Sequence, residues 1–384
     1  MAGYEEFDEN SVPLVMKLLK SLYGLRQSPT NWRGTIDEHL VEIGFKSLKS
    51  DPCAYTYSDG GAMVILTLYV DDVLLIGKDL TVIRRIKQKL MSRFSMTDMR
   101  DVSLELGMGV TRDREKGTVT ITQDNYTKSL LERHGMASCN PTYTPSVGKE
   151  LSLDRPEEKL PSKDDKHCFQ AITGSVMYLG QVTRYDILYA VNQLARTMFK
   201  PSTAHMAAAM HLLRHLAGAT DFAITYKQGG LKLTAFSDAN WGDNPKNGKS
   251  MSSYFVFLSN ASVSCKWLTA QSTMEAELVA AALTMKEAVF CSNMMKELAF
   301  GTRFDRVPLY IDYTSTLHFA GNRNYSPRVK HVALRYFFIQ ELVKEARISI
   351  HYVKTEDQLS DIGTKYLGKH KHRYLLKLIN EFMA

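Results

Sequence analysis

The segment LTLYVDDVLLIG at residues 66–77 places two adjacent carboxylates, Asp71 and Asp72, inside an otherwise apolar run. Burying one unpaired charge is costly, and burying two like charges side by side costs more. Consecutive residues on a regular strand face opposite sides of a sheet, so both side chains can approach one site only at a tight turn between two strands. The run therefore predicts two strands that turn at the Asp-Asp pair. This pair is either a plain hairpin turn or part of a metal site.

Two further hairpins are expected around this run. CAYTYS (53–58) and AMVILTLYV (62–70) are rich in β-forming residues and flank Asp-Gly-Gly at 59–61, which is a strong turn signal. GVTRDREKGTVTITQ (109–123) predicts a second hairpin that turns near its Lys-Gly pair. The first part of the chain is therefore expected to be rich in antiparallel sheet.

Composition limits the classes of protein to which the chain can belong. Its 384 residues suggest two or three domains, and an excess of Lys plus Arg (48) over Asp plus Glu (41) gives a net charge of +7, which suits a polyanion partner such as nucleic acid. The five cysteines are scattered without CxxC spacing, which argues against a disulfide framework or a zinc knuckle. No apolar run approaches the roughly 20 residues of a membrane span, and the acidic N-terminus lacks a signal-peptide pattern. We expect an intracellular protein, cytoplasmic or nuclear, without a membrane partner.

A segment rich in Pro, Ser, Lys and acidic residues at 140–166 indicates a linker. The expected parts are a first domain at 1–139, a linker and helical region at 140–230, a third domain at 231–368, and a C-terminal helical tail at 369–384. The first expected helix has its N-cap at Ser28 and its first residue at Pro29, and it ends at Gly44. Further helices are expected over Leu80–Phe94, Phe169–Ala217, Ser272–Phe300, Ser315–Ala320 and His331–Ala346, and from Glu356 onward. The expected strands of the third domain are KLTAFSD, SYFVFLS, SCKWLT, VPLYID and ISIHYV.

Four acidic residues of the third domain fall at the ends of expected elements: Asp238, Glu277, Asp312 and Asp361. Each alone would be read as an ordinary surface acid, since Asp favours strand ends and Glu favours early helical turns. Together they favour a site, because clustered carboxylates repel unless cations neutralise them, and oxygen ligands suit Mg²⁺ or Mn²⁺. Two such ions about 4 Å apart can activate water and stabilise the leaving oxygen in phosphodiester hydrolysis.

Several other side chains could be either functional or purely structural. The histidines of HMAAAMHLLRH (His205, His211 and His215) have spacings that could suit a metal, but no acidic or Cys partner follows at ligand spacing, which favours packed side chains. Trp241, just past Asp238, could equally stack on a base or pack internally. The basic segment at 365–374 (KYLGKHKHRY) could contact phosphates or form a solvated helix end.

Seven segments together carry a family resemblance: SLYGLRQSPTNW, SDPCAYTY, LYVDDVLLIG, GSVMYLGQVTRYDILYAV, STMEAELVAA, VKHVALRYFFIQE and EDQLSDIGTKYL. Their sequences and order resemble the copia-type retrotransposon Pol polyprotein, over nearly the whole chain from Leu14 to Leu367. The resemblance implies an α+β and α/β fold. Its parts would be a partial right-hand polymerase palm and thumb, a linker, and a ribonuclease H-like domain with a mixed sheet.

The resemblance also implies roles for single residues. Asp71 and Asp72 match the polymerase carboxylates that hold catalytic Mg²⁺. It suggests substrate-binding candidates in the segment that lines the nucleotide and template pocket (Gln27, Ser28 and Pro29) and in the hairpin that grips the primer (Arg112). Trp241 is a further candidate because of its place just past Asp238, not because of the resemblance. Asp238, Glu277, Asp312 and Asp361 match the metal ligands of ribonuclease H, which cleaves RNA in an RNA–DNA hybrid. Glu277 is chosen over Glu275 from its place in STMEAEL. Other Pol-derived or Gag-derived chains are implied as partners.

The chain also departs from the family pattern. It has no segment like D-V-K-T-A-F-L, which would carry the third polymerase carboxylate, so polymerisation is expected to be lost. The family's TRPDI reads TRYDI here, and its DILTKPL reads DIGTKYL. Gly363 in an intended helix is expected to cost roughly 1 kcal/mol of stability. Two functions therefore stay open, namely metal-dependent hydrolysis of RNA in a hybrid, and non-catalytic nucleic-acid binding by a retrotransposon relic.

Overall fold

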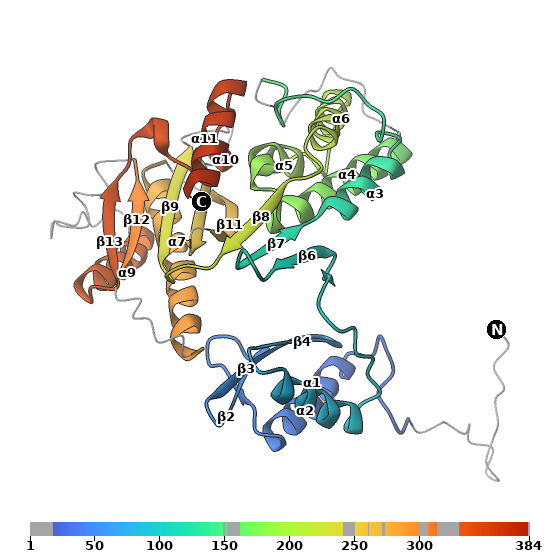
Figure 1. Ribbon diagram of the computed structural model, residues 1–384. Coiled ribbons are helices and arrows are strands. Elements are labelled where there is room, and N and C mark those ends of the chain that lie inside the picture. The colour runs from blue at the N-terminus through green and yellow to red at the C-terminus, as the bar shows by residue number, and fades with distance from the viewer. Residues whose placement is uncertain are drawn as a thin grey trace, which may run out of the picture. The chain divides into compact units, whose positions relative to one another are not determined.

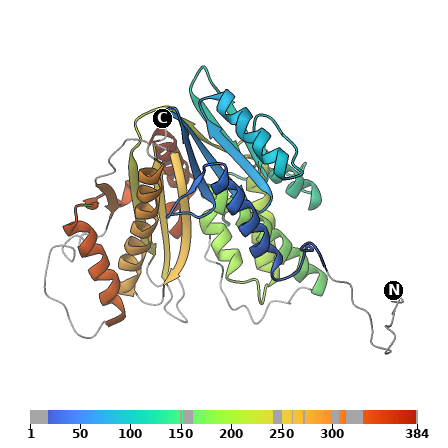
Figure 2. The same cartoon turned by 90° about the horizontal axis from the view of Figure 1, so that it is seen from below.

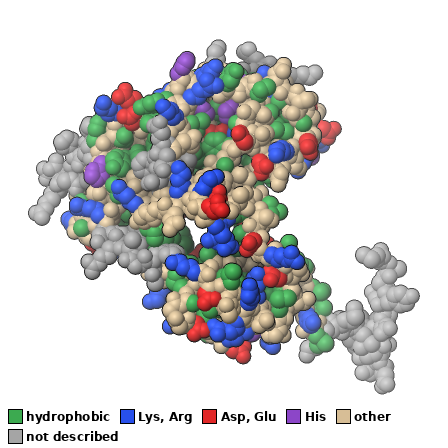
Figure 3. Space-filling view, in the orientation of Figure 1, with side chains coloured by type: hydrophobic (Ala, Val, Ile, Leu, Met, Phe, Trp, Pro, Cys, Tyr) green, Lys and Arg blue, Asp and Glu red, His purple; other side chains and the backbone are tan. Residues whose placement is uncertain are grey.

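The computed structural model shows two compact units, residues 1–99 and 100–384, which are described separately (Figure 1). The structure describes residues 18–148, 151, 162–240, 250–259, 261–270, 273–298, 306–312 and 330–382. Lys and Arg side chains are spread over the face of both units that Figure 3 shows, with Asp and Glu among them. The positive net charge is therefore not gathered into one patch on that face.

The first unit is an antiparallel sheet covered by two helices. Its elements are α1 (Ser28–Glu42), β1 (Lys46–Ser47), β2 (Ala54–Asp59), β3 (Ala62–Tyr69), β4 (Asp72–Gly77) and α2 (Leu80–Arg93), with strand order β1-β2-β3-β4. The two helices share one core with the sheet, in which Ile36 and Leu40 of α1 and Ile86 of α2 pack with Val64 and Leu66 of β3. Alternation of apolar and less buried residues along β3 thus directs one face of the sheet toward the helices.

Local sequence signals account for the turns of this unit. The two-residue turn between β2 and β3 has φ values of 56° at Gly60 and 86° at Gly61, which glycine adopts readily. Gly44, at φ 105°, follows the end of α1. These predictions are confirmed. The predicted N-cap at Ser28 is wrong by one residue, because Gln27 is the N-cap and Ser28 is already helical.

The second unit begins with a sheet that joins segments far apart in the sequence. Its strands are β5 (Leu104–Glu105), β6 (Met108–Asp113), β7 (Thr118–Thr122) and β8 (Ala223–Lys227), paired antiparallel in that order. Strand β8 was not among the predicted strands. Because β7 pairs with β8, with Ile121 opposite Ile224, the hairpin belongs to the second unit. The compact units accordingly divide between Met99 and Arg100, whereas the sequence predicts a first domain that reaches residue 139.

The helical region packs around its own core. Its elements are α3 (Asp124–Arg133), α4 (Lys163–Val182), the short helix η1 (Tyr185–Ile187), α5 (Leu188–Ala195) and α6 (Thr203–Ala217). Phe169 and Val176 of α4, Leu194 of α5 and Leu212 of α6 are buried together in this core. The predicted helix over 169–217 is therefore divided. The break before α6 falls at Pro201, because the residue before a proline disfavours helical dihedral angles.

A five-stranded mixed sheet forms the C-terminal part of the second unit. Its strands are β9 (Leu233–Asn240), β10 (Ser250–Leu258), β11 (Ala261–Ala270), β12 (Val307–Ile311) and β13 (Ile348–Tyr352), in the order β11-β10-β9-β12-β13. β9, β10 and β11 are antiparallel, whereas β12 is parallel to β9 and β13. This arrangement confirms the predicted fold class, an α/β protein with a mixed sheet.

Helices cover both faces of this sheet (Figures 1 and 2). They are α7 (Thr273–Glu297) and α9 (Lys330–Lys344) on one face, and α10 (Asp361–Thr364) and α11 (Lys369–Phe382) on the other. Consecutive residues of β9 face the two cores on opposite sides of the sheet: Ala235 packs toward α7, and Phe236 packs toward α11. Leu375 and Ile379 of α11 are fully buried, so the predicted C-terminal tail is part of this core.

Two of the predicted helices in the C-terminal part are not observed as expected. The predicted helix from Glu356 is instead a short helix η2 (Thr355–Asp357) followed by α10 and α11, and the predicted helix at 315–320 lies outside the described residues. Among the described helices, one stretch in α7, Ala276–Glu297, is long and apolar enough to cross a membrane by composition. Its packing against the sheet and α9 accounts for that composition, as in the core helix of a globular domain.

Candidate metal centre

Three carboxylates from separate elements converge at the carboxyl ends of the neighbouring strands β9 and β12. Asp238 lies in β9, Asp312 follows β12, and Asp361 begins α10. The parallel pairing of Tyr310 with Phe236 places the two strand-end aspartates side by side. One oxygen from each of the three carboxylates lies within 4.8 Å of the others, and Asp238 and Asp361 are only 1% and 3% exposed. This is a partly enclosed set of oxygen ligands.

Glu277 lies next to this cluster on α7. Its side chain is 8% exposed, and its Oε1 accepts a hydrogen bond of 3.2 Å from the backbone N–H of Ala239. Burial and then the nearby Asp238 and Asp312 raise the pKa of Glu277 to about 9. The structure therefore places Glu277 beside the cluster but outside its closest group of three. The side chain of Glu275 lies outside the described part of the chain.

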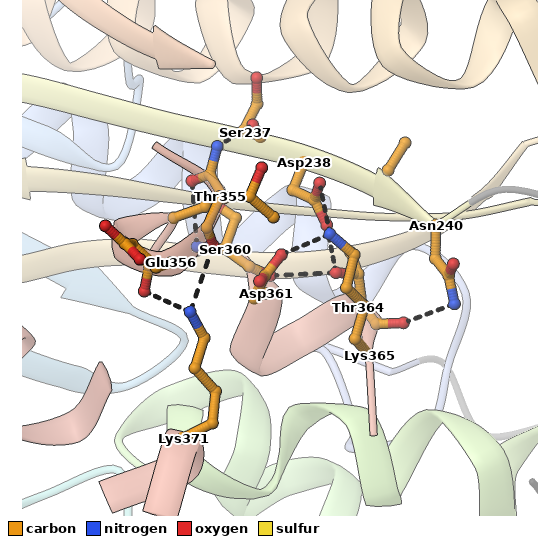
Figure 4. Close-up of polar contacts among 12 residues, drawn as sticks. Ser237, Asp238, Asn240, Thr355, Glu356, Ser360, Asp361, Thr364, Lys365 and Lys371 are labelled. Carbon is orange, nitrogen blue, oxygen red and sulfur yellow. Dashed lines mark hydrogen bonds and ion pairs between the residues drawn. The ribbon is translucent and has the colours of Figure 1, made fainter. Parts of the chain in front are cut away.

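The short helix α10 is tied to β9 by side-chain hydrogen bonds, several of which Figure 4 shows. Thr364 Oγ1 donates to Asp238 Oδ2, and Asn240 Nδ2 donates to the Thr364 carbonyl at 3.2 Å. Just before α10, Gln358 Nε2 donates to the Ser237 carbonyl at 3.0 Å. These bonds hold the first residue of α10 at the end of β9, where its carboxylate joins the cluster.

Lys365 places a positive charge inside the cluster (Figure 4). Its Nζ lies 2.6 Å from Asp361 Oδ1 and 3.2 Å from Asp238 Oδ1. The sequence interpretation missed this contact and assigned the segment 365–374 to phosphate contact or to a solvated helix end. Lys365 follows the last residue of α10 and lies four positions after Asp361, a spacing typical of acid–base pairs on helices, which is the signal that could have indicated the pair.

The single positive charge of Lys365 does not fully offset the repulsion among the carboxylates, and the pKa values of Asp361 and Asp312 are raised. Burial and then Asp238 raise the pKa of Asp361 to about 7, although Lys365 opposes the shift. The same two causes raise the pKa of Asp312. Burial alone would lower the pKa of Lys365, but Asp238 and Asp361 raise it overall, so its ammonium is retained. Oxygen ligands with such raised pKa values fit a Mg²⁺ or Mn²⁺ ion, which would offset their repulsion.

Gly363 lets α10 approach the sheet. A Cβ added at this glycine would lie 2.7 Å from Ser253 Cβ, closer than real side chains pack. Ser253 in β10 is the register partner of Asp238, so this contact lies directly beside the cluster. The predicted cost in helix stability is therefore not the whole role of Gly363, because a larger side chain at this position would meet Ser253 where α10 approaches the sheet.

The packing of the second unit also accommodates Tyr185, the tyrosine in place of proline in the family's TRPDI segment. Tyr185 in TRYDI is fully buried, and its ring makes edge contacts with Phe222 and Phe255 at centroid distances of 5.0 and 5.7 Å. The tyrosine thus fills a space between the helical region and the mixed sheet.

The predicted turn forms between β3 and β4, one residue earlier than expected: Val70 and Asp71 make the turn, Asp72 begins β4, and both aspartates are exposed. Val70 in this turn has φ 55°, a strained value for a β-branched residue. Tyr23 Oη donates to Asp71 at 3.1 Å, and Trp32 Nε1 donates to the Val70 carbonyl at 2.6 Å. Within the described ranges, no third acidic, His or Cys side chain joins this pair in a metal-sized group.

The other substrate-binding candidates belong to different parts of the chain. Gln27 occupies the N-cap position of α1 without a side-chain capping hydrogen bond, and Ser28 and Pro29 begin this helix of the first unit. Arg112 is an exposed residue of β6 in the second unit. Trp241 lies outside the described residues. Their assignment to substrate binding stays a prediction.

A buried ion network accounts for one of the histidines. The guanidinium of Arg184 binds both carboxylate oxygens of Asp186 at 2.8 and 2.7 Å, and His215 Nε2 lies 3.1 Å from the same carboxylate. His372 of α11 contacts the Asp186 carbonyl at 2.9 Å. Burial opposes ionisation of Asp186, but Arg184 and His215 outweigh it and hold its pKa below the usual range. His215 is therefore a packed side chain rather than a metal ligand.

The sequence matches one known family model and several known relatives. A family model described as reverse transcriptase (RNA-dependent DNA polymerase) matches residues 3–148. The retrovirus-related Pol polyprotein from transposon TNT 1-94 of Nicotiana tabacum is 31% identical over 95% of this chain and 28% of its own length. The corresponding polyprotein from transposon RE1 of Arabidopsis thaliana is 33% identical over 94% of this chain and 25% of its own length. The chain thus spans about a quarter of the length of these relatives.

Among solved structures, the foamy viral protease-reverse transcriptase in complex with RNA/DNA hybrid is 14% identical, with a TM-score of 0.46 over 87% of this chain and 39% of that chain. A likeness of this size does not by itself establish a shared fold. The sequence similarity along nearly the whole chain does establish a relationship. The chain belongs to the copia-type retrotransposon Pol family, and its residues 3–148 match the reverse transcriptase family model.

Proposed function

We propose that the second unit hydrolyses the RNA strand of an RNA–DNA hybrid with the help of Mg²⁺ or Mn²⁺. The observation that supports this proposal most strongly is the convergence of Asp238, Asp312 and Asp361 from three elements, with Glu277 beside them. Bringing several carboxylates together in a buried site raises the free energy of their ionised forms unless a cation is present, so packing alone does not account for the cluster. The site would act inside the cell, in the cytoplasm or the nucleus.

The residues of the chain divide the work of such a site. Divalent ions held there would activate a water molecule and stabilise the leaving oxygen of the phosphodiester. Asp238, Asp312 and Asp361 would hold such ions. Thr364 donates to one oxygen of Asp238, and Lys365 lies between its other oxygen and Asp361. Glu277, whose pKa is raised to about 9, is protonated at neutral pH until a cation makes its ionised form favourable. The backbone N–H of Ala239 holds its carboxyl group toward the site.

The test is cleavage of an end-labelled RNA–DNA hybrid with Mg²⁺ or Mn²⁺. We expect cleavage by the wild-type chain and a loss of at least about 100-fold with Asp238→Asn, since ligand removal disturbs the position of the metal. Asp71→Asn, which removes a carboxylate from the first unit, is the matched control and should cleave like the wild type. Cleavage that survives Asp238→Asn would show that the activity lies elsewhere or in a contaminant.

A second candidate is a nucleic-acid-binding protein without catalysis. It is favoured by one observation, namely that Lys365 already neutralises part of the cluster without a metal. Binding of the hybrid with no cleavage over a wide range of Mg²⁺ and Mn²⁺ concentrations would support it. Binding should weaken steeply as salt rises, because contacts with a polyanion release counterions.

We further propose that the 384-residue chain does not polymerise DNA by itself. Asp71 and Asp72 lie at an exposed turn without a third ligand among the described residues, and in-line attack depends on the geometry of the metal ions. Extension of a labelled primer on an RNA template by the purified chain would refute this. Restoration of extension by another Pol-derived chain would show that a further ligand can be supplied in trans.

A further inference from the structure

We infer that the ammonium group of Lys365 is a built-in counter-cation of the carboxylate cluster, which a divalent ion must displace in order to bind. This inference rests on the proposed metal-dependent function and adds to it a residue that sets the affinity of the site for metal. Lys365 would thereby keep the cluster stable when no metal ion is bound.

The position of Lys365 follows from the hydrogen bonds of α10. Thr364, the preceding residue, is bound to Asp238, and Gly363 packs closely on Ser253. The backbone of Lys365 is therefore held at the cluster, and its Nζ contacts carboxylates of two different elements, Asp238 of β9 and Asp361 of α10. An ammonium group that was only part of a solvated helix end would have no reason to join two buried acids.

The partners of Asp238 explain why the lysine and a metal ion compete. Oδ2 of this carboxylate accepts from Thr364, and Oδ1 accepts from Lys365 at 3.2 Å. A metal ion bound to Asp238 must replace one of these partners or share an oxygen with it. If it shared Oδ1 with Lys365, two cations would lie within a few ångströms of each other in a buried site, where repulsion is weakly screened. Displacement of the flexible lysine side chain avoids this repulsion.

The test compares Mg²⁺ binding by wild type and Lys365→Met, measured by isothermal titration calorimetry without nucleic acid. Methionine keeps an unbranched chain of similar length and removes the charge. We expect the Kd for Mg²⁺ to fall by about tenfold or more, since a competing cation has been removed from the cluster. The matched control is Lys128→Met, which removes a lysine paired with Asp124 at 3.2 Å with the same four-residue spacing. Its Kd should equal that of wild type.

The outcomes separate this inference from the proposed function. An unchanged or weaker Mg²⁺ affinity in Lys365→Met, with binding intact in wild type, overturns the inference and leaves the metal site in place. No Mg²⁺ binding by either protein overturns both. Binding that persists in Asp238→Asn places the ion away from the cluster and also overturns both.

A measurement on the wild-type chain keeps the inference testable if Lys365→Met does not fold. The reactivity of each lysine toward an acylating reagent is followed by peptide mass spectrometry with and without Mg²⁺. A displaced Lys365 should become several-fold more reactive when Mg²⁺ is added, whereas Lys128 should not change. A reactivity of Lys365 that stays constant or falls overturns the inference.

Discussion

Substitution of Gly363 by alanine distinguishes two explanations of this residue. Helix propensity alone predicts that Gly363→Ala stabilises the protein by up to about 1 kcal/mol. The structure predicts the opposite, because the new methyl group would lie 2.7 Å from Ser253 Cβ. Ser253 cannot yield easily, since it is fully buried in β10 between β9 and β11. Overpacking of this kind typically costs about 1–3 kcal/mol.

The net effect is therefore expected to be a destabilisation of about 1–2 kcal/mol, since the gain in propensity offsets part of the overpacking. For a unit of this size each 1 kcal/mol lowers Tm by roughly 2–4 °C. Thermal denaturation followed by circular dichroism measures the change, with a parallel titration of Mg²⁺. Because α10 would move away from β9 and carry Asp361 with it, the stabilisation by Mg²⁺ should also decrease.

Ser253→Gly provides the matched test of the mechanism. It removes both side-chain atoms that the new methyl group would meet. In the Gly363→Ala background it should restore the Mg²⁺-dependent increase in Tm, although it weakens the strand by itself. A Gly363→Ala protein that is more stable than wild type, with an unchanged response to Mg²⁺, would refute the packing argument.

Three further predictions concern charge and packing in the second unit. Without divalent ions the stability of this unit should fall as pH rises from about 5 to 9. The reason is that Glu277 and Asp361, with pKa values raised to about 9 and about 7, stay protonated in the folded state after they have ionised in the unfolded state. Tm measured across this range tests the prediction, and the increase in Tm on adding Mg²⁺ should be larger at pH 8 than at pH 5.5. Asp186→Asn should cost about 3–5 kcal/mol in urea unfolding, because a buried arginine loses its charged partner, whereas Asp124→Asn in an exposed pair should cost about 0–1 kcal/mol. Leu375→Ala should cost about 2–5 kcal/mol, since α11 is part of the core; a loss below about 0.5 kcal/mol in urea unfolding would mean that α11 does not pack there.

Elements stabilised by nearby residues could be predicted from the sequence. The hairpin at Gly60-Gly61 forms as expected and the turn at Asp71-Asp72 forms within one residue of its predicted place, because positive φ values and alternation of apolar residues are local properties. Strand β8 could not be predicted in the same way. Its residues Ala223–Lys227 become a strand because β7, more than a hundred positions earlier, offers an edge for pairing.

The same division applies to the candidate site. The resemblance indicated four carboxylates, and the structure brings Asp238, Asp312 and Asp361 together and places Glu277 beside them. It did not indicate Lys365, whose role depends on where α10 lies against β9. The segment that contains this lysine is simply basic in sequence, and a basic segment is usually exposed.

The sequence by itself determined the family, the acidic residues and the strands that carry them, because each depends on residue identity and short-range spacing. Only the tertiary structure decided what the glycine and the lysine of DIGTK do. Gly363 permits a close approach between a helix and a strand, and Lys365 then reaches two acids that lie 4 and 127 residues away in the chain. Both effects arise from distances between elements, which act through packing and Coulomb forces and are fixed only when the sheet and its helices have assembled.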